Sequence, residues 1–484
     1  MAARMADNPM LKFVTAPQDY PSKRSAEDRR ADFREIAERY AAPSAEAQAA
    51  RCSQCGVPYC SVHCPLHNHI PDWLRLTAEG RVREAYELSN ATSTMPEICG
   101  RICPQDRLCE GNCVIEFSGH GAVTIGSVEK FITDTAWEEG WVEPIRPQPD
   151  RGQSVGVIGA GPAGLTTAEY LRTLGYAVHV YDRHDRPGGL LTYGIPGFKL
   201  EKQIITRRVE RLRDAGIVFH ENFAVGREAT LDQLRNKHDA LLIATGVYKP
   251  RAIRAPGVGA PGVVDALDYL ISSNRKGFGD AVPAFDDGSL DAAGKHVVVI
   301  GGGDTAMDCV RTAVRQGAAS VKCLYRRDRA NMPGSQREVA HAEEEGVEFV
   351  WLSGPEAFDG TDAVTGVRAT RMRLGQPDAS GRRAPEPDAG SAFRLEADLV
   401  IKALGFDAED LPRLFDAPEL GVTRWGTVRV DHKTMMTSLP GVFAAGDIVR
   451  GASLVVWAIR DGRDVTEHMH AWLKAKAARE RIAA

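Results

Sequence analysis

The spacing of apolar and polar residues changes near residue 150 of this 484-residue chain. In residues 32–40 and 70–88, apolar residues recur at helical spacing, and no strand alternates convincingly through this first part. From residue 154 to 246, short apolar runs typical of buried strands alternate with helical segments, and a second such unit begins at Lys295. Residues 452–472 again have helical periodicity. The pattern predicts a mostly α-helical first domain followed by α/β structure.

Breaks in the pattern give the expected boundaries. Residues 143–150 carry three prolines in eight residues, which favours an extended connection. Residues 375–390, rich in Gly, Pro, Asp and Arg, predict a surface loop or hairpin. Residues 1–30 are polar, and their composition fits equally a packed arm and a solvated tail. We place the domains at residues 1–150, 151–290, 291–405 and 406–484.

Composition excludes some classes of function. The chain has 60 basic and 65 acidic residues, which give a formal net charge of -5. This charge does not suggest binding to nucleic acid or an anionic membrane. The longest apolar stretches are far too short to span a bilayer. The first ten residues contain no apolar run that could serve as a signal peptide. We therefore expect a cytoplasmic protein.

Cysteines are concentrated in the first domain. Eight of the ten lie in two runs: Cys52, Cys55, Cys60 and Cys64, then Cys99, Cys103, Cys109 and Cys113. Two of these cysteines, Cys64 and Cys103, precede proline, and this ending and the short spacings are typical of ligands for two iron–sulfur clusters. A disulfide framework would need an oxidising compartment, whereas a pair of zinc sites is harder to exclude.

A first glycine-rich turn follows the apolar run 155–158. Gly159, Gly161 and Gly164 form a G-x-G-x-x-G motif with Pro162 and Ala163, and Asp182 ends the next predicted strand. Such glycines let the backbone approach a pyrophosphate, the following helix stabilises its charge, and an acid about 20 residues on accepts ribose hydroxyls. Strand, turn, helix and acid together predict a dinucleotide site rather than an ordinary βα turn.

A second glycine-rich turn follows the apolar run 296–300. It comprises Gly301, Gly302, Gly303, Asp304, Thr305 and Ala306, and its next strand ends in Arg326 and Arg327. Arginine at this position accommodates a ribose 2′-phosphate, which predicts NADPH; the alternative is solvated surface charge. The first turn should then bind FAD. We expect further turns to lie near the cofactors and to add these residues to the binding sites: Gly189, Leu190, Ala244, Thr245, Gly246, Gly405, Gly446 and Asp447.

These motifs, in this order, resemble flavoproteins in which an NADPH domain is inserted into an FAD domain. The match begins near Gln153 and includes residues 186–190 and 446–447. With the cysteine domain in front, the chain is similar to the family of small (β) subunits of NADPH-dependent glutamate synthase. The resemblance implies an α/β fold with two Rossmann-like domains, preceded by a mostly α-helical iron–sulfur domain. Residues 151–290 and 406–484 would bind FAD, and residues 291–405 NADPH.

The resemblance also implies ligands for two 4Fe–4S clusters. Cys52, Cys55, Cys60 and Cys113 would bind one cluster, and Cys64, Cys103 and Cys109 the other. Relatives complete the second cluster with a Gln or Glu that aligns with Glu129. Cys99 is left as a spare or a competing ligand.

An electron-input function is implied as well. NADPH would reduce FAD by hydride transfer, with no catalytic acid or base required, and electrons would pass through the clusters to a large (α) subunit that makes glutamate from glutamine and 2-oxoglutarate. The chain has no candidate N-terminal cysteine nucleophile and no room for a further (β/α)8 barrel, so we expect it to need this partner in a hetero-oligomer.

Three other readings stay open at this point. A disulfide reductase would need a close cysteine pair after Cys113, and none occurs. A module for another acceptor, as in dihydropyrimidine dehydrogenase or an electron-bifurcating transhydrogenase, would use the same motifs. A zinc-stabilised docking module would lack iron.

Overall fold

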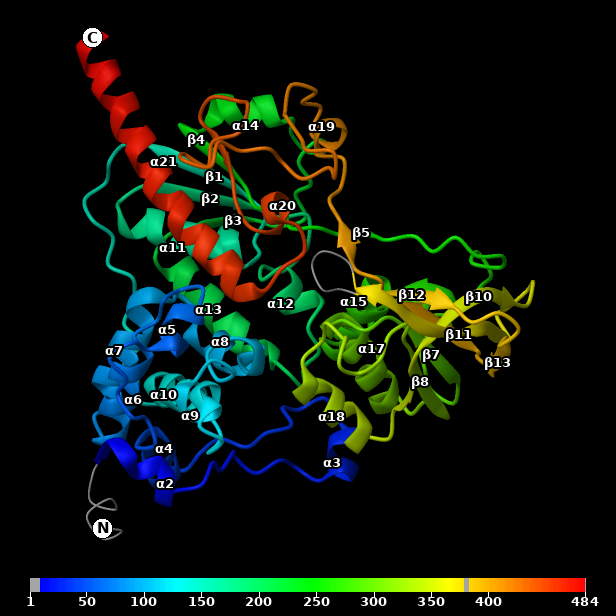
Figure 1. Cartoon of the computed structure of the whole chain (residues 1–484). Coiled ribbons are helices and arrows are strands. Elements are labelled where there is room, and N and C mark those ends of the chain that lie inside the picture. Colours follow the sequence, from blue (N-terminus) through cyan, green and yellow to red (C-terminus); the bar gives the residue numbers. More distant parts are fainter. Residues whose placement is uncertain (1–8, 378–382, 484) are drawn as a thin grey trace.

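The computed structural model describes residues 9–377 and 383–483. Within them lie a helical N-terminal part, two five-stranded parallel sheets and a four-stranded antiparallel sheet (Figure 1). No helix in this described part is long and apolar enough to cross a membrane. The expected fold class, two Rossmann-like units behind a helical domain, is confirmed.

The helical part packs around one apolar core that includes Trp73 and Phe131. Its helices are α4 (Ala42–Ala49), α5 (Tyr59–His63), α6 (Ile70–Ala78), α7 (Val82–Thr92), α8 (Pro96–Ile102), α9 (Val114–Phe117) and α10 (Ile125–Glu138), with a 3-10 turn η2 (Gln105–Arg107). The predicted helical stretch 70–88 is two helices, because the chain turns at Gly80, whose φ is +73°. Such a φ suits glycine and ends α6.

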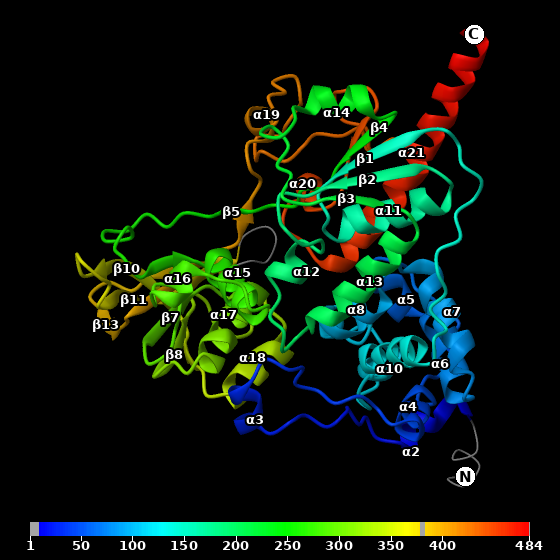
Figure 2. The same ribbon diagram turned by 180° about the vertical axis from the view of Figure 1, so that it is seen from behind.

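Residues 32–40 are not helical, contrary to the periodicity. After η1 (Pro9–Leu11), α2 (Lys12–Thr15) and α3 (Ala26–Ala31), the chain runs back in an extended conformation. The backbone N–H of Ile36 donates to the carbonyl of Phe198, and that of Arg24 donates to Ile36. These tertiary hydrogen bonds replace the helical ones. Residues 9–41 therefore form an arm that lies on the chain's own surface. Its helix α3 lies beside α18 (Figures 1 and 2).

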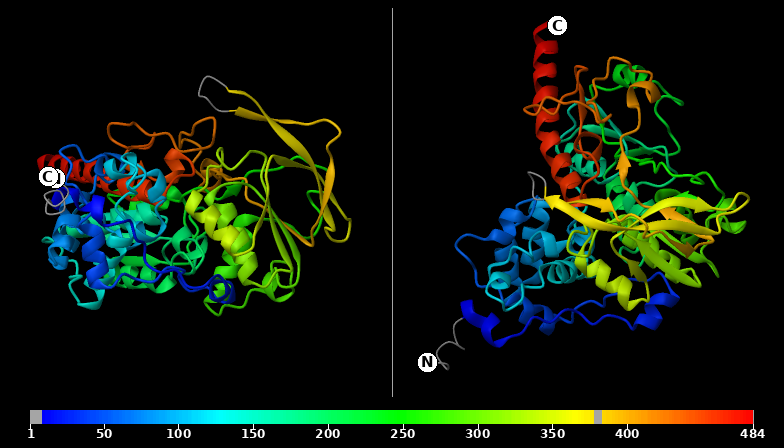
Figure 3. Two further views of the ribbon diagram at one scale, coloured as in Figure 1. Left: turned by 60° about the horizontal axis from the view of Figure 1, so that its bottom comes forward. Right: turned by 45° about the vertical axis from the view of Figure 1, so that its right-hand side comes forward.

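The first sheet has the strand order β16-β4-β1-β2-β3, with all strands parallel. The strands are β1 (Ser154–Ile158), β2 (Ala177–Tyr181), β3 (Val218–His220), β4 (Ala240–Ile243) and β16 (Val442–Ala444). Its helices are α11 (Pro162–Thr173), α12 (Leu190–Tyr193), α13 (Lys202–Asp214), α14 (Leu231–Lys237), α20 (Asp447–Arg450) and α21 (Val455–Ala483). Since β16 returns to this sheet late in the chain, the second unit is an insertion. The end of α21 projects from the molecule (Figure 3).

The inserted unit has the strand order β6-β14-β7-β8-β9. Its strands are β6 (Val263–Asp265), β7 (His296–Ile300), β8 (Ser320–Leu324), β9 (Glu348–Val350) and β14 (Leu399–Lys402); its helices are α15 (Ala266–Gly277), α16 (Pro283–Asp286), α17 (Asp304–Arg315) and α18 (Gln336–Glu344). Edge strand β6 belongs to this sheet, although it lies before residue 291, where the NADPH domain was expected to begin. The division into four segments otherwise stays a prediction.

Smaller elements complete the insertion. The antiparallel sheet comprises β10 (Ser353–Asp359), β11 (Gly366–Pro377), β12 (Arg383–Pro387) and β13 (Phe393–Glu396), and the β11–β12 hairpin occupies the segment 375–390. Residues 378–382 lie outside the described part. The two connections between the parallel sheets pair as β5 (Lys249–Pro250) and β15 (Phe406–Asp407), and α19 (Leu411–Leu414) follows.

A buried ion pair joins the helical part to the first sheet's helices. Glu97 on α8 accepts two hydrogen bonds from Arg208 on α13, at 2.8 and 2.7 Å, and both side chains are at most 1% exposed. Removing one partner leaves the other charge buried and unpaired. We expect Glu97→Gln to lower the free energy of unfolding by about 3–5 kcal/mol.

The melting temperature of the purified chain measures this loss. The matched control is Glu84→Gln, because Glu84 pairs with Arg81 on the exposed face of α7 and should leave the melting temperature unchanged. Equal melting temperatures for the two variants would contradict the role given to Glu97.

Candidate functional site: two cradles and two cysteine groups around one pocket

The first cradle lies at the carboxyl edge of the first sheet. Strands β1, β2, β4 and β16 are parallel, so the turns that follow them meet at one edge. A Cβ on Gly164 would lie 2.0 Å from the carbonyl oxygen of Gly159, so only glycine lets α11 approach the turn this closely. Asp182 at the end of β2 accepts the backbone N–H of Ala160 at 2.7 Å and holds the turn.

Other predicted residues gather at the same edge. A Cβ on Gly189, which precedes Leu190 and α12, would lie 2.9 Å from the Cα of Gly161, and one on Gly446 would lie 3.0 Å from the Cβ of Ala163. Pro162 and Ala163 form the first turn of α11, and Ala244, Thr245 and Gly246 follow β4. The buried Thr245 hydroxyl has no hydrogen-bond partner within the described residues. Close backbone approach and an unpaired polar atom fit a bound dinucleotide.

Asp447 begins α20 at this edge. Burial raises the pKa of its carboxyl to about 6. A hydrogen-bond donor on a bound ligand would offset the cost of that burial.

The second cradle repeats the arrangement in the inserted unit. Gly301 has a φ of +150°, and a Cβ there would lie 2.2 Å from the carbonyl oxygen of Ala403. Gly302 and Gly303 lead into α17, whose first turn carries Asp304, Thr305 and Ala306. The Asp304 carboxylate accepts the backbone N–H of Ser335 at 2.9 Å. Gly405 follows β14 on the same edge, where its carbonyl accepts the N–H of Arg251.

Arg326 and Arg327 follow β8 next to this cradle. Arg326 is exposed, whereas Arg327 is 8% exposed and its Nε has no hydrogen-bond partner within the described residues. A buried, unpaired guanidinium N–H is costly, and an anionic group of a ligand would satisfy it. Both arginines follow β8, and their contact with a 2′-phosphate stays a prediction.

The cysteines form two groups. Cys52, Cys55, Cys60 and Cys113 line one small cavity with Tyr59 and Val114. This is the set that the resemblance implied for one cluster, although Cys113 is distant in sequence from the other three.

The second group surrounds Glu129. A hydrogen bond with Cys99, together with burial, raises the pKa of Cys103 well above its ordinary value; Glu129 and Cys109 add to the effect. Burial raises the pKa of Cys64, with Cys99 and Glu129 nearby, and raises the pKa of Glu129 itself to about 8. Burial and mutual repulsion oppose the anionic forms, which a cationic cluster would stabilise.

No three His, Cys, Asp or Glu side chains within residues 9–377 and 383–483 are placed to bind a single metal ion. A 4Fe–4S cluster does not need that arrangement, because its four ligands bind four different irons. His63, His67 and His69 are exposed, as expected of side chains that face solvent.

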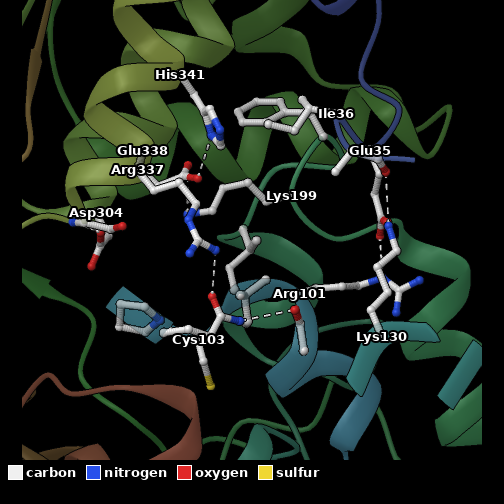
Figure 4. Close-up of a pocket in the computed structure, with 18 of the residues that line it drawn as sticks. Glu35, Ile36, Arg101, Cys103, Lys130, Lys199, Asp304, Arg337, Glu338 and His341 are labelled. Atoms are coloured by element: carbon white, nitrogen blue, oxygen red, sulfur yellow. Dashed lines mark hydrogen bonds and ion pairs between the residues drawn. The ribbon is translucent and has the colours of Figure 1, made fainter. Parts of the chain in front are cut away.

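A pocket of about 620 Å³ lies where the three parts of the chain meet. Asp304 and Thr305 of the second cradle, residues 453–455 before and within α21, and Cys103 all line it (Figure 4). Lys199 also lines it, but its Nζ is 2.9 Å from Asp308 and 3.6 Å from Glu338 rather than free for a phosphate. The pocket thus joins the second cradle to a cysteine of the second group.

Several residues around the second cysteine group and the pocket belong to no motif. Asn68 and Ser89 donate to the Oε1 atom of Glu129 at 3.3 and 3.2 Å. Arg337, which is labelled in Figure 4, donates to Gln105 Oε1 at 3.2 Å, and both of these residues line the pocket. Their positions depend on tertiary packing, so the sequence gives no signal for them.

Two family models match the chain. Residues 29–141 match "Dihydropyrimidine dehydrogenase domain II, 4Fe-4S cluster", and residues 153–462 match "Pyridine nucleotide-disulphide oxidoreductase". The glutamate synthase [NADPH] small chain of Azospirillum brasilense is 68% identical over 98% of both chains. The chain belongs to the family of glutamate synthase small chains. It is an oxidoreductase, as the sequence predicted.

Other proteins resemble this chain to different degrees. The glutamate synthase [NADPH] small chain of Escherichia coli is 46% identical over 96% of this chain and 99% of its own. The Escherichia coli oxidoreductase AegA is 45% identical over 96% of this chain, but this match spans 71% of AegA. The structure of FprA from Mycobacterium tuberculosis, at 22% identity and a TM-score of 0.58, covers 69% of this chain and 87% of its own, and shares the fold.

Proposed function

We propose that this chain is the electron-input subunit of an NADPH-dependent glutamate synthase. It would hold FAD in the first cradle, NADPH in the second and two 4Fe–4S clusters in the cysteine groups. When bound, these cofactors supply hydride acceptance and the conversion of two-electron into one-electron transfer. The observation that carries the proposal is the shared pocket, because the second cradle and the cluster ligand Cys103 open onto the same space.

In this proposal, the residues of the chain bind and orient the cofactors. Asp182 orders the turn for the flavin dinucleotide, Arg326 and Arg327 select the 2′-phosphate, and the pocket brings the reacting groups together. No acid or base is needed among them. Thiolate ligands require a reducing compartment, so we place the enzyme in the cytoplasm.

The partner would be the large glutamate synthase subunit. Support comes from exposed apolar side chains beside the first cysteine group: Val57 (60% exposed), Tyr59 (47%), Val62 (53%) and Phe117 (69%). Tyr59 also lines the cavity of Cys52 and Cys60. An exposed apolar patch of this kind marks a protein interface, and here it lies where a cluster could pass electrons outward.

Reconstitution tests the function. The purified chain is mixed with the large subunit, and NADPH-, glutamine- and 2-oxoglutarate-dependent glutamate formation is measured with iron content. We expect glutamate only in the mixture, and NADPH-driven dye reduction by the chain alone. Glutamate made by the chain alone would contradict the proposal.

A second candidate is the same electron-input role for a different acceptor. The observation that favours it is the 45% identity to AegA, which carries the name of an oxidoreductase without reference to glutamate. In that case the reconstituted mixture would reduce dye with NADPH and contain iron, but would form no glutamate.

Glu129 is proposed as the fourth ligand of the second cluster. Its Oε1 atom accepts hydrogen bonds from Asn68 and Ser89, which orient the carboxylate. We expect Glu129→Ala to lower iron content and visible absorbance, because one cluster loses a ligand.

Cys99→Ala is the matched control for this variant, since Cys99 lies in the same buried group. It should keep the iron of the unmodified chain. Iron loss in Cys99→Ala with full iron in Glu129→Ala would reverse the assignment.

A further inference from the structure

The helix α18 of the inserted unit docks on the loop that carries Cys103 and Cys109. Arg337, at the start of α18, donates to Gln105 Oε1 at 3.2 Å, to the Tyr20 hydroxyl at 3.2 Å and to Glu110 Oε2 at 2.7 Å. Tyr20 belongs to the arm, and its ring also lies 5.0 Å from the Arg337 guanidinium. One side chain therefore joins the nucleotide-binding unit, the cysteine domain and the arm.

Glu110 makes this contact more than a surface ion pair. It follows Cys109 directly and is 2% exposed. Its Oε1 accepts the backbone N–H of Gly126 at 3.0 Å, and its Oε2 accepts the Tyr20 hydroxyl at 2.9 Å. Among the ion pairs of the described residues, Arg337 is the cation that pairs with Glu110. Arg337 thus places a positive charge beside a buried carboxylate, and movement of α18 away from the cysteine loop would break this ion pair.

A second contact connects this docking to the nucleotide cradle. Ser335 donates its backbone N–H to Asp304 at 2.9 Å, and its hydroxyl to the carboxylate of Asp106 at 3.2 and 3.3 Å. Arg107 donates to the carbonyl of Pro333. The segment 333–337 thus contacts the cradle on one side and the cysteine loop on the other.

We propose that Arg337 is a positioning residue that holds the second cradle against the Cys103–Cys109 loop, so that a bound nucleotide faces the shared pocket in one orientation. Arg337 acts through Glu110 and Gln105 rather than on the reacting groups. The inference rests on the proposed function for its kinetic consequence. The docking itself can be measured without any nucleotide.

The test compares the full-length, iron-loaded chain with Arg337→Met. The methionine side chain keeps an unbranched apolar stem but loses the charge and the hydrogen bonds of the guanidinium group. We expect faster deuterium uptake in residues 104–110 and 333–341 in the absence of nucleotide. We also expect the rate constant for bleaching of the flavin absorbance by NADPH to fall about tenfold, because a misplaced second cradle slows hydride transfer. The KM for NADPH should change little.

Matched variants isolate the effect. Arg329→Met removes an exposed arginine, paired with Glu343 in the same region, and should match the unmodified chain in both measurements. Arg337→Lys keeps a charge for Glu110 but cannot reach three partners, and should give intermediate values. Ser335→Ala removes the hydroxyl contact with Asp106, and should raise uptake in residues 104–110 even if Arg337→Met fails to retain iron.

Unchanged uptake in Arg337→Met and Ser335→Ala would overturn the proposal. A raised KM with unchanged uptake would also overturn it, since Arg337 would then contact the nucleotide directly. If NADPH failed to bleach the unmodified chain, the proposed function would fail, whereas the uptake comparison would still decide the docking.

Discussion

Replacing Cys60 with alanine is expected to abolish electron delivery to the large subunit while leaving the flavin reducible by NADPH. Cys60 lines the cavity of the first cysteine group with Cys52, Cys55 and Cys113. A 4Fe–4S cluster needs four ligands, so iron should fall by about half if the chain holds two clusters. Glutamate formation with the large subunit should fall more than about 100-fold, because the flavin and the acceptor lose their connection. Iron analysis, stopped-flow bleaching and the reconstituted assay measure these three quantities.

Cys309→Ala is the control for this variant. Cys309 is fully buried on α17, outside both cysteine groups. Its replacement removes a thiol without removing a proposed ligand, so the iron content should stay unchanged. Full iron in Cys60→Ala, or equal iron loss in both variants, would contradict the assignment of the first group.

The glycine turns were predictable because each is local. A strand, a tight turn and a helix N-terminus follow one another within about fifteen residues. Gly164 is required within that stretch, because its Cβ would meet the carbonyl oxygen of Gly159, whereas a Cβ on Gly159 would meet the carbonyl oxygen of Ala244 after β4. The parallel sheets then bring the turns after β1, β2, β4 and β16 to one edge. Local sequence plus the fold class therefore accounts for both cradles.

The cysteine groups required more than spacing. Cys113 meets Cys52, Cys55 and Cys60 in a cavity that residues of α6 and α10 also line, whereas spacing by itself would pair neighbours along the chain. The resemblance to a known family supplied this crossed arrangement. The packing around Trp73 and Phe131 is its physical basis.

Tertiary contacts explain what the sequence pattern missed. Residues 32–40 have helical periodicity, yet Glu35 binds Arg101 and Lys130 at 2.7 Å each, and Ile36 packs in an extended segment. Partners from distant parts of the chain thus override the local preference. Edge strand β6 is three residues long, too short for periodicity to reveal. Arg337 is one arginine among many until its buried partner Glu110 is known.

The double variant Arg326→Ala/Arg327→Ala is expected to remove the preference for NADPH over NADH. The Nε of Arg327 is buried without a partner within the described residues, and the exposed Arg326 directly precedes it after the end of β8. The double variant lacks two groups that would form charge-assisted hydrogen bonds with the 2′-phosphate. The KM for NADPH should therefore rise about 100-fold. The KM for NADH should change little, because NADH lacks that phosphate. Steady-state dye reduction with each nucleotide measures both values.

Folding should survive this change, since truncating Arg327 removes a buried unpaired donor rather than a partner of another buried group. Arg329→Ala is the control: Arg329 follows closely in the chain but is exposed and pairs with Glu343. It should leave both KM values unchanged. An unmodified chain that used NADH as well as NADPH, or a double variant with an unchanged KM for NADPH, would show that these arginines do not read the 2′-phosphate. In the second case, the selectivity would have to come from other groups at this edge of the sheet, such as those on α17 or the β14 turn.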